Sequence, residues 1–133
     1  MADERFVDFW AKTIATRSPA ILQQLRAVAF SMIAARRALR DTMPGEFVHC
    51  PSLDLLLELF VADRKATAMT ALTASAPTAP SVTRRWIDVF VQRDLVKVRG
   101  DDVTLTEAGF RMMADACQAV IESQMSATVI RPN

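Results

Sequence analysis

The sequence predicts a mainly α-helical fold with one small β-hairpin. Three observations predict it: apolar residues recur at three- and four-residue spacing along most of the chain, helix start and stop residues separate these stretches, and residues 96–106 alternate between apolar and polar. With 133 residues, 51% of them hydrophobic and 23% charged, the chain has the size of one domain with flanking helices. No apolar run approaches the roughly 20 residues that a membrane span needs.

The first part of the sequence, residues 1–45, is expected to form two helices. One covers residues 3–15. Ser18 and Pro19 then start a longer helix that runs to about Arg40, because serine caps free N–H groups and proline fits the first helical turn. Its apolar spacing is that of a seam that packs on another helix, so we assign this part to dimerisation. The seam positions are Leu22, Leu25, Ala29, Met32, Arg36 and Leu39, with Ile21 and Val28 beside them.

The middle of the sequence predicts a core helix and then two further helices separated by a tight turn. The apolar core helix is expected over residues 53–63, and a short helix over residues 66–75. Pro77 and Pro80 cannot continue the short helix because proline lacks an N–H donor, so another helix begins near Pro80. Its two sides differ in polarity. Val82, Trp86, Val89, Phe90 and Arg93 should face the core, and Ser81, Arg84, Arg85, Asp88 and Gln92 lie on the opposite side.

The sequence then changes from helical to alternating periodicity. Val96 and Val98 alternate with Lys97 and Arg99, a glycine-containing turn follows, and a second alternating stretch ends at Thr106. This pattern is typical of a β-hairpin with one face toward the core.

The order of these elements is that of a winged helix-turn-helix. Residues 46–106 contain the helix, short helix, turn, helix and hairpin in that order. A last helix is expected over residues 107–124, capped by Thr106. Its apolar side is expected to pack on another helix. We therefore assign residues 107–133 to a C-terminal dimerisation helix and a tail.

Basic residues are concentrated in the predicted turn, second helix and hairpin. Residues 64–99 contain seven basic and two acidic side chains, a net charge of +5, whereas the whole chain carries +1. A helix that enters the DNA major groove turns its first residues toward the bases, where arginine can bind guanine or phosphate. The candidate DNA contacts are Thr67 and Thr70 on the short helix, Ser81, Arg84, Arg85, Asp88 and Gln92 on the second helix, and Lys97 and Arg99 on the hairpin.

These residues also have plain structural interpretations. Arg84 and Arg85 alone would be an ordinary solvated helix face, and it is the basic hairpin together with the preceding threonines that favours DNA binding. Trp86 could stack on a base, but its helical phase favours the core. The methionines could line a ligand pocket, although they more often fill gaps between helices.

Catalytic and metal chemistry find no support in the sequence. Cys50 and Cys117 lack metal-ligand spacing and are interpreted as buried, reduced thiols, with a redox switch as the alternative. His49 has no second imidazole nearby and is interpreted as a loop residue. Asp54 and Glu58 share a helix face and are interpreted as a solvated edge. We expect no enzyme, metal site or cofactor.

Four motifs together suggest a family. They are Ala34-Ala-Arg-Arg-Ala-Leu-Arg40, Pro51-Ser-Leu-Asp-Leu-Leu-Leu-Glu-Leu-Phe60, Pro80-Ser-Val-Thr-Arg-Arg-Trp-Ile87 and Leu105-Thr-Glu-Ala-Gly109. With them the chain resembles the MarR-like winged-helix transcriptional regulators over most of its length. The resemblance implies a homodimer built from the N- and C-terminal helices, with DNA contacts from Ser81, Thr83, Arg84 and Arg85 and from the wing.

The hairpin departs from that family pattern. It is shorter than is usual, it carries Asp101 and Asp102 at its tip, and Asp94 stands where a glycine usually precedes the first strand.

We expect a homodimeric, sequence-specific regulator that binds double-stranded DNA, and the sequence identifies no small-molecule effector for it. A winged-helix module that binds another protein is the alternative. Because the acidic start of the chain lacks the basic region of a signal peptide, we expect a cytoplasmic protein.

Overall fold

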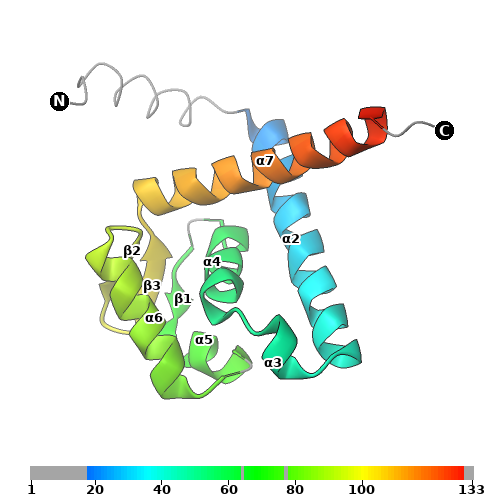
Figure 1. Cartoon of the computed structure of the whole chain (residues 1–133). Coiled ribbons are helices and arrows are strands. Elements are labelled where there is room, and N and C mark those ends of the chain that lie inside the picture. The colour runs from blue at the N-terminus through cyan, green and yellow to red at the C-terminus, as the bar shows by residue number, and fades with distance from the viewer. Residues whose placement is uncertain (1–17, 64, 77, 131–133) are drawn as a thin grey trace.

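A computed structural model describes residues 18–63, 65–76 and 78–130, with side chains as far as Ser126. The helix predicted over residues 3–15 lies outside these ranges. The described chain is mainly helical and contains a small three-stranded antiparallel sheet (Figure 1). None of its helices combines the length and apolar composition that a membrane crossing requires.

Most predicted helices are present, with shifted ends. The helix start at Ser18 is confirmed, because its hydroxyl oxygen accepts a hydrogen bond from the Ile21 N–H at 3.2 Å. A helix after residue 44 was not predicted, and the last helix extends past the predicted end at residue 124. The helices are α2 (Pro19–Thr42), α3 (Gly45–Val48), α4 (Pro51–Val61), α5 (Met69–Ser75), α6 (Pro80–Gln92) and α7 (Glu107–Ile130).

The predicted hairpin is confirmed as β2 (Val96–Arg99) and β3 (Asp102–Leu105). Gly100 in its turn has a φ of +60°, a conformation that glycine adopts without steric cost. A third strand, β1 (Thr67–Ala68), pairs with the other edge of β3. The prediction of a helix from residue 66 was therefore wrong at its start. The reason is that β1 depends on pairing with a strand about 35 residues later, which local periodicity does not reveal.

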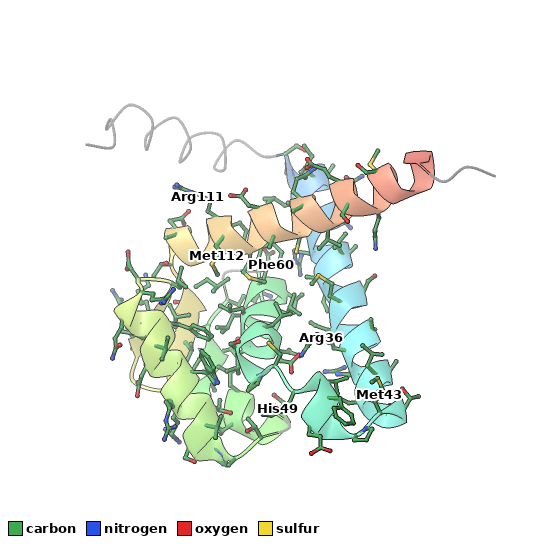
Figure 2. The ribbon with its side chains drawn as sticks, viewed as in Figure 1. Arg36, Met43, His49, Phe60, Arg111 and Met112 are labelled. Carbon is green, nitrogen blue, oxygen red and sulfur yellow. The ribbon has the colours of Figure 1, made fainter. Side chains whose placement is uncertain are left out.

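Two hydrophobic cores share α4. One lies between α2, α4 and α7, where the rings of Phe60 and Phe110 have centroids 5.2 Å apart (Phe60 is labelled in Figure 2). The other lies between α4, α5, α6 and the sheet. The first comprises Leu25, Ala29, Ile33, Leu57, Phe60, Phe110, Met113, Ala114 and Cys117, and the second comprises Leu55, Leu59, Leu72, Ile87, Phe90, Val96 and Val103.

The apolar seams of α2 and α7 therefore pack mainly on each other and on α4 within one chain. The seam on α2 also ends differently from the prediction, because Ile33 is buried while Leu39 and Ile21 are 45% and 42% exposed. Excess apolar surface on these two helices, which motivated the expected dimer, is thus smaller than the sequence indicates.

The start of α7 is held against the short connection between α6 and β2 by two hydrogen bonds of Thr106 and a close backbone approach. The carbonyl oxygen of Leu95 accepts the Thr106 N–H at 3.0 Å, and the Thr106 hydroxyl donates to the Asp94 carbonyl at 2.6 Å. Asp94 itself has a φ of 59°, a left-handed conformation that favours glycine. A glycine at position 94 would adopt this φ without steric cost. A Cβ atom on Gly109 would lie 2.0 Å from the Leu95 carbonyl oxygen, so this contact requires glycine.

We expect Gly109→Ala to lower the free energy of unfolding by about 1 to 3 kcal/mol or more, because α7 must shift away from Leu95. Gly45→Ala is the matched control, since a Cβ there meets nothing within 4 Å. Urea unfolding followed by circular dichroism measures both. Equal stability of the two variants would contradict the proposed close approach.

Candidate nucleic-acid interface

The outward side of α6 carries the polar and basic residues that the sequence predicts there. Pro80 occupies the first turn, and the backbone N–H of Thr83 bonds to the Ala79 carbonyl at 3.2 Å. The inward side is centred on Thr83, Ile87 and Phe90, so the predicted inward side was wrong in part. Of the residues expected to face the core only Phe90 is buried, and Arg93 is exposed, because the helix is rotated relative to the predicted phase. The predicted outward residues Ser81, Arg84, Arg85, Asp88 and Gln92 are all exposed.

Thr83 is not part of this exposed side. Its side chain is fully buried, so the expectation that it contacts DNA is wrong. The helical phase explains this, since Thr83 precedes Ile87 by four residues and Phe90 by seven, and these three share one side. Trp86 is half-buried and stacks on Phe90 with ring centroids 6.1 Å apart, as expected for a core residue.

Lys97 and Arg99 project from β2 into solvent. They flank a shallow hollow that also includes Asp102 and Thr104, which lie opposite Arg99 and Lys97 on β3. Because β2 contacts α6, the exposed cations of the hairpin and of α6 belong to neighbouring elements.

The two threonines predicted as phosphate donors lie in different surroundings. Thr67 is in β1 rather than in a helix and is half-buried opposite Val103. Thr70 is exposed at the start of α5, but its hydroxyl donates to the Asp101 carboxylate at 3.2 Å. In this arrangement neither threonine offers a free donor pointing outward from a helix.

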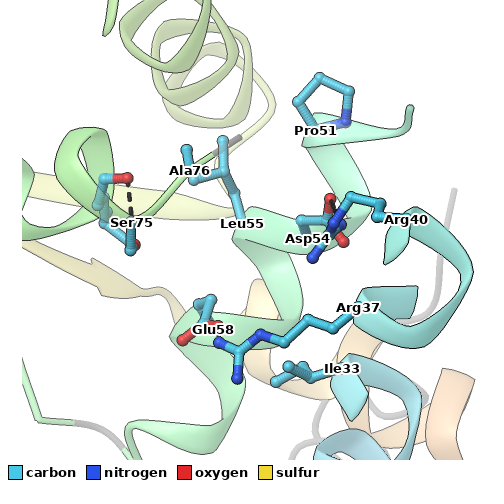
Figure 3. A pocket seen from close by; sticks show the side chains of 10 residues that line it. Ile33, Arg37, Arg40, Pro51, Asp54, Leu55, Glu58, Ser75 and Ala76 are labelled. Atoms are coloured by element: carbon cyan, nitrogen blue, oxygen red, sulfur yellow. Dashed lines mark hydrogen bonds and ion pairs between the residues drawn. The ribbon is translucent and has the colours of Figure 1, made fainter. Parts of the chain in front are cut away.

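The arginines of α2 are paired with carboxylates. Asp54 accepts hydrogen bonds from Arg36 at 2.5 Å and from Arg40 at 2.9 Å, and all three side chains are less than one quarter exposed. The hydrogen bond to Asp54 raises the pKa of Arg36, so this guanidinium stays charged. Figure 3 shows Arg40 beside Asp54 and Arg37 beside Glu58. The nitrogen and oxygen of the Arg37–Glu58 ion pair are 3.5 Å apart.

The interpretation of Asp54 as a solvated edge was therefore wrong. Arg36 extends from α2 toward α4 (Figure 2) and also donates to the carbonyls of Val48 and Cys50, at 3.3 and 3.4 Å. One guanidinium thus fixes the connection between α3 and α4. Sequence spacing could not reveal this, because Arg36 and Asp54 are 18 positions apart and lie on different helices.

The basic residues of α6 and the hairpin differ from those of α2. Arg84, Arg85, Lys97 and Arg99 form no hydrogen bond or ion pair with any residue that the structure describes. The charges on α2 are thus used within the fold, whereas those on α6 and β2 face solvent without partners. Such unpartnered cations on neighbouring elements are suited to phosphate groups.

The remaining candidate residues from the sequence are His49 and the two cysteines. His49 is exposed in the loop between α3 and α4, as predicted. Cys117 is buried, and burial raises the pKa of its thiol, whereas Cys50 is only half-buried. Within the described residues, no group of three or more His, Cys, Asp and Glu side chains could hold a metal ion.

Neither a protein-family model, nor a curated protein, nor a solved structure matches this chain at a significant level.

We expect Asp54→Ala to lower the free energy of unfolding by about 2 to 3 kcal/mol, because it leaves two largely buried guanidinium groups without a carboxylate. Glu58→Ala removes a more exposed carboxylate from the same helix and should cost about 0.5 kcal/mol or less. Chemical denaturation of the two variants gives both values. If Asp54→Ala lowers the free energy of unfolding no more than Glu58→Ala does, the ion pairs of Asp54 with Arg36 and Arg40 do not stabilise the fold.

Proposed function

We propose that this chain is a winged helix-turn-helix regulator that binds double-stranded DNA as a homodimer. In this proposal α5 and α6 are the helix-turn-helix, α6 is the recognition helix, and β2 and β3 are the wing. The observation that carries it is that Arg84, Arg85, Lys97 and Arg99, on the neighbouring elements α6 and β2, are exposed and have no ion-pair partner among the described residues. Every arginine of α2, by contrast, contacts a carboxylate.

The dimensions of α6 support major-groove binding. Its 13 residues make a rod of about 20 Å at 1.5 Å per residue, and the major groove is about 12 Å wide, enough to admit a helix. Its exposed side offers Ser81, Arg84 and Arg85 in the first two turns, where a recognition helix meets base edges. Arginine placed there can bind guanine through two hydrogen bonds.

The hairpin supports a complementary role. Lys97 and Arg99 lie on one side of β2, and a strand presents such residues at a spacing close to that of successive phosphates. Phosphate contacts add affinity without sequence information. We therefore assign sequence choice to α6 and general affinity to β2.

The surface between α2 and α7 supports the dimer. A groove there is lined by Ala27, Val28, Ser31, Met32, Ala35, Val120 and Gln124. In our proposal a second copy covers this apolar groove and spaces two α6 helices about one DNA turn apart, roughly 34 Å.

For DNA binding, we expect Arg84→Ala or Arg85→Ala to reduce the preference for a cognate over a scrambled duplex by about 1 to 3 kcal/mol. Lys97→Ala or Arg99→Ala should weaken both duplexes alike and reduce the salt slope by about one unit per lost phosphate contact. Fluorescence anisotropy at two salt concentrations, with a cognate site first selected from random duplexes, measures these effects. If both helix variants keep the full preference, base reading by α6 is excluded and the protein-binding alternative becomes the better explanation.

For the dimer, Ala35→Glu should shift the protein toward a monomer, because it places a charge in the groove between α2 and α7. Ala108→Glu, on the exposed first turn of α7, is the control for the same substitution. Light scattering at micromolar concentration gives the mass. A wild-type monomer, or an unchanged dimer in Ala35→Glu, would contradict the proposed interface.

A further inference from the structure

The tip of the hairpin is attached to the start of α5 by two hydrogen bonds. The Met69 N–H donates to the Asp101 backbone carbonyl at 2.7 Å, and the Thr70 hydroxyl donates to the Asp101 carboxylate at 3.2 Å. The first contact extends the pairing of β1 with β3 by one more bond. The second is the one side-chain hydrogen bond that the structure describes between the hairpin turn and α5.

An acidic residue at a wing tip would by itself oppose DNA binding, because it repels phosphate. Asp101, however, directs its carboxylate to Thr70 within the same chain. Asp102, the other acid of the tip, has no such contact with α5 and lies across from Arg99. The two acids therefore differ in structural role although they are neighbours in the sequence.

The attachment determines where the cations of the hairpin lie. Lys97 and Arg99 are on β2, β2 is held by β3, and the turn after β2 is fixed to α5 through Asp101. Helix α5 in turn packs on α6. The bond between Asp101 and Thr70 thus links the position of the hairpin cations to that of Arg84 and Arg85.

We propose that Asp101 is a positioning residue that, through Thr70, holds the hairpin at the angle at which Lys97 and Arg99 reach DNA phosphates while α6 is in the groove. This inference rests on the proposed DNA binding. In this proposal the acidic residue Asp101 favours DNA binding, because it holds the hairpin cations in place.

Two pairs of variants separate the hydrogen bond from the charge. Asp101→Asn and Asp101→Ala both remove the negative charge, but only asparagine keeps an oxygen that accepts from Thr70. Thr70→Ser and Thr70→Val leave all charges unchanged, but only serine keeps the hydroxyl donor. Each pair therefore differs in the hydrogen bond while its charge stays constant.

We expect Asp101→Ala to bind duplex DNA about two- to tenfold more weakly than Asp101→Asn, and Thr70→Val to show the same loss relative to Thr70→Ser. The dependence of log affinity on log salt concentration should be shallower in Asp101→Ala than in Asp101→Asn, and in Thr70→Val than in Thr70→Ser, because phosphate contacts of the hairpin are lost. Anisotropy titrations with a random duplex at two salt concentrations measure both quantities. Equal affinities within each pair, with both Asp101 variants tighter than wild type, would mean that the acid only repels DNA and would overturn the proposal.

Amide hydrogen exchange in the DNA-free protein tests the attachment itself. The Met69 amide and the hairpin amides should exchange faster in Thr70→Val than in Thr70→Ser. Unchanged exchange overturns the attachment. If wild-type protein binds no duplex at all, the proposed function and the role of Asp101 in it both fail, while the exchange data still decide whether Asp101 holds the hairpin.

Discussion

Burial of α4 on nearly every side is the constraint on which the rest of the structure depends. Leu57 and Phe60 face α2 and α7, whereas Leu55 and Leu59 face α5, α6 and the sheet. A helix that is apolar all round must be enclosed, so the other elements are arranged around it in two groups (Figure 1). Asp54 and Glu58 are the charged residues of this helix, and each is paired with at least one guanidinium group of α2. The less exposed of the two, Asp54, binds Arg36 and Arg40 and so joins α4 to α2.

Local patterns in the sequence were sufficient to predict much of the fold. The Ser18 cap, the proline at the start of α6 and the alternation over β2 and β3 each depend on neighbouring residues, and all are present. The features that were missed depend on residues far apart in the chain. Strand β1 exists because β3 offers it a partner, and Ile33 rather than Leu39 lies in the core that α2 forms with α4 and α7. Periodicity within one helix does not contain that information.

In the candidate site, too, features set by local periodicity were predicted and features set by distant residues were not. The exposed side of α6 followed from its 3.6-residue period, and five of its assigned residues are exposed. Thr83 entered only through a family resemblance, and its burial shows that a short polar residue can occupy a core position when its phase requires it. Which arginines are paired and which are unpartnered could not be read from composition. That distinction depends on where Asp54 and Glu58 lie in space, and it separates structural cations from candidates for binding.

The strand order suggests a second role for Lys97 and Arg99. Because β3 lies between β1 and β2, one edge of β2 has no strand beside it in the part of the chain that the structure describes. An open edge offers its N–H and carbonyl groups to any strand of another molecule, which is a common route to aggregation. Two like-charged side chains on this short strand, beside a Val98 that is 38% exposed, make such edge-to-edge pairing unfavourable through mutual repulsion. Selection on these two positions would therefore act through colloidal solubility as well as through any ligand, and the two pressures favour the same charge.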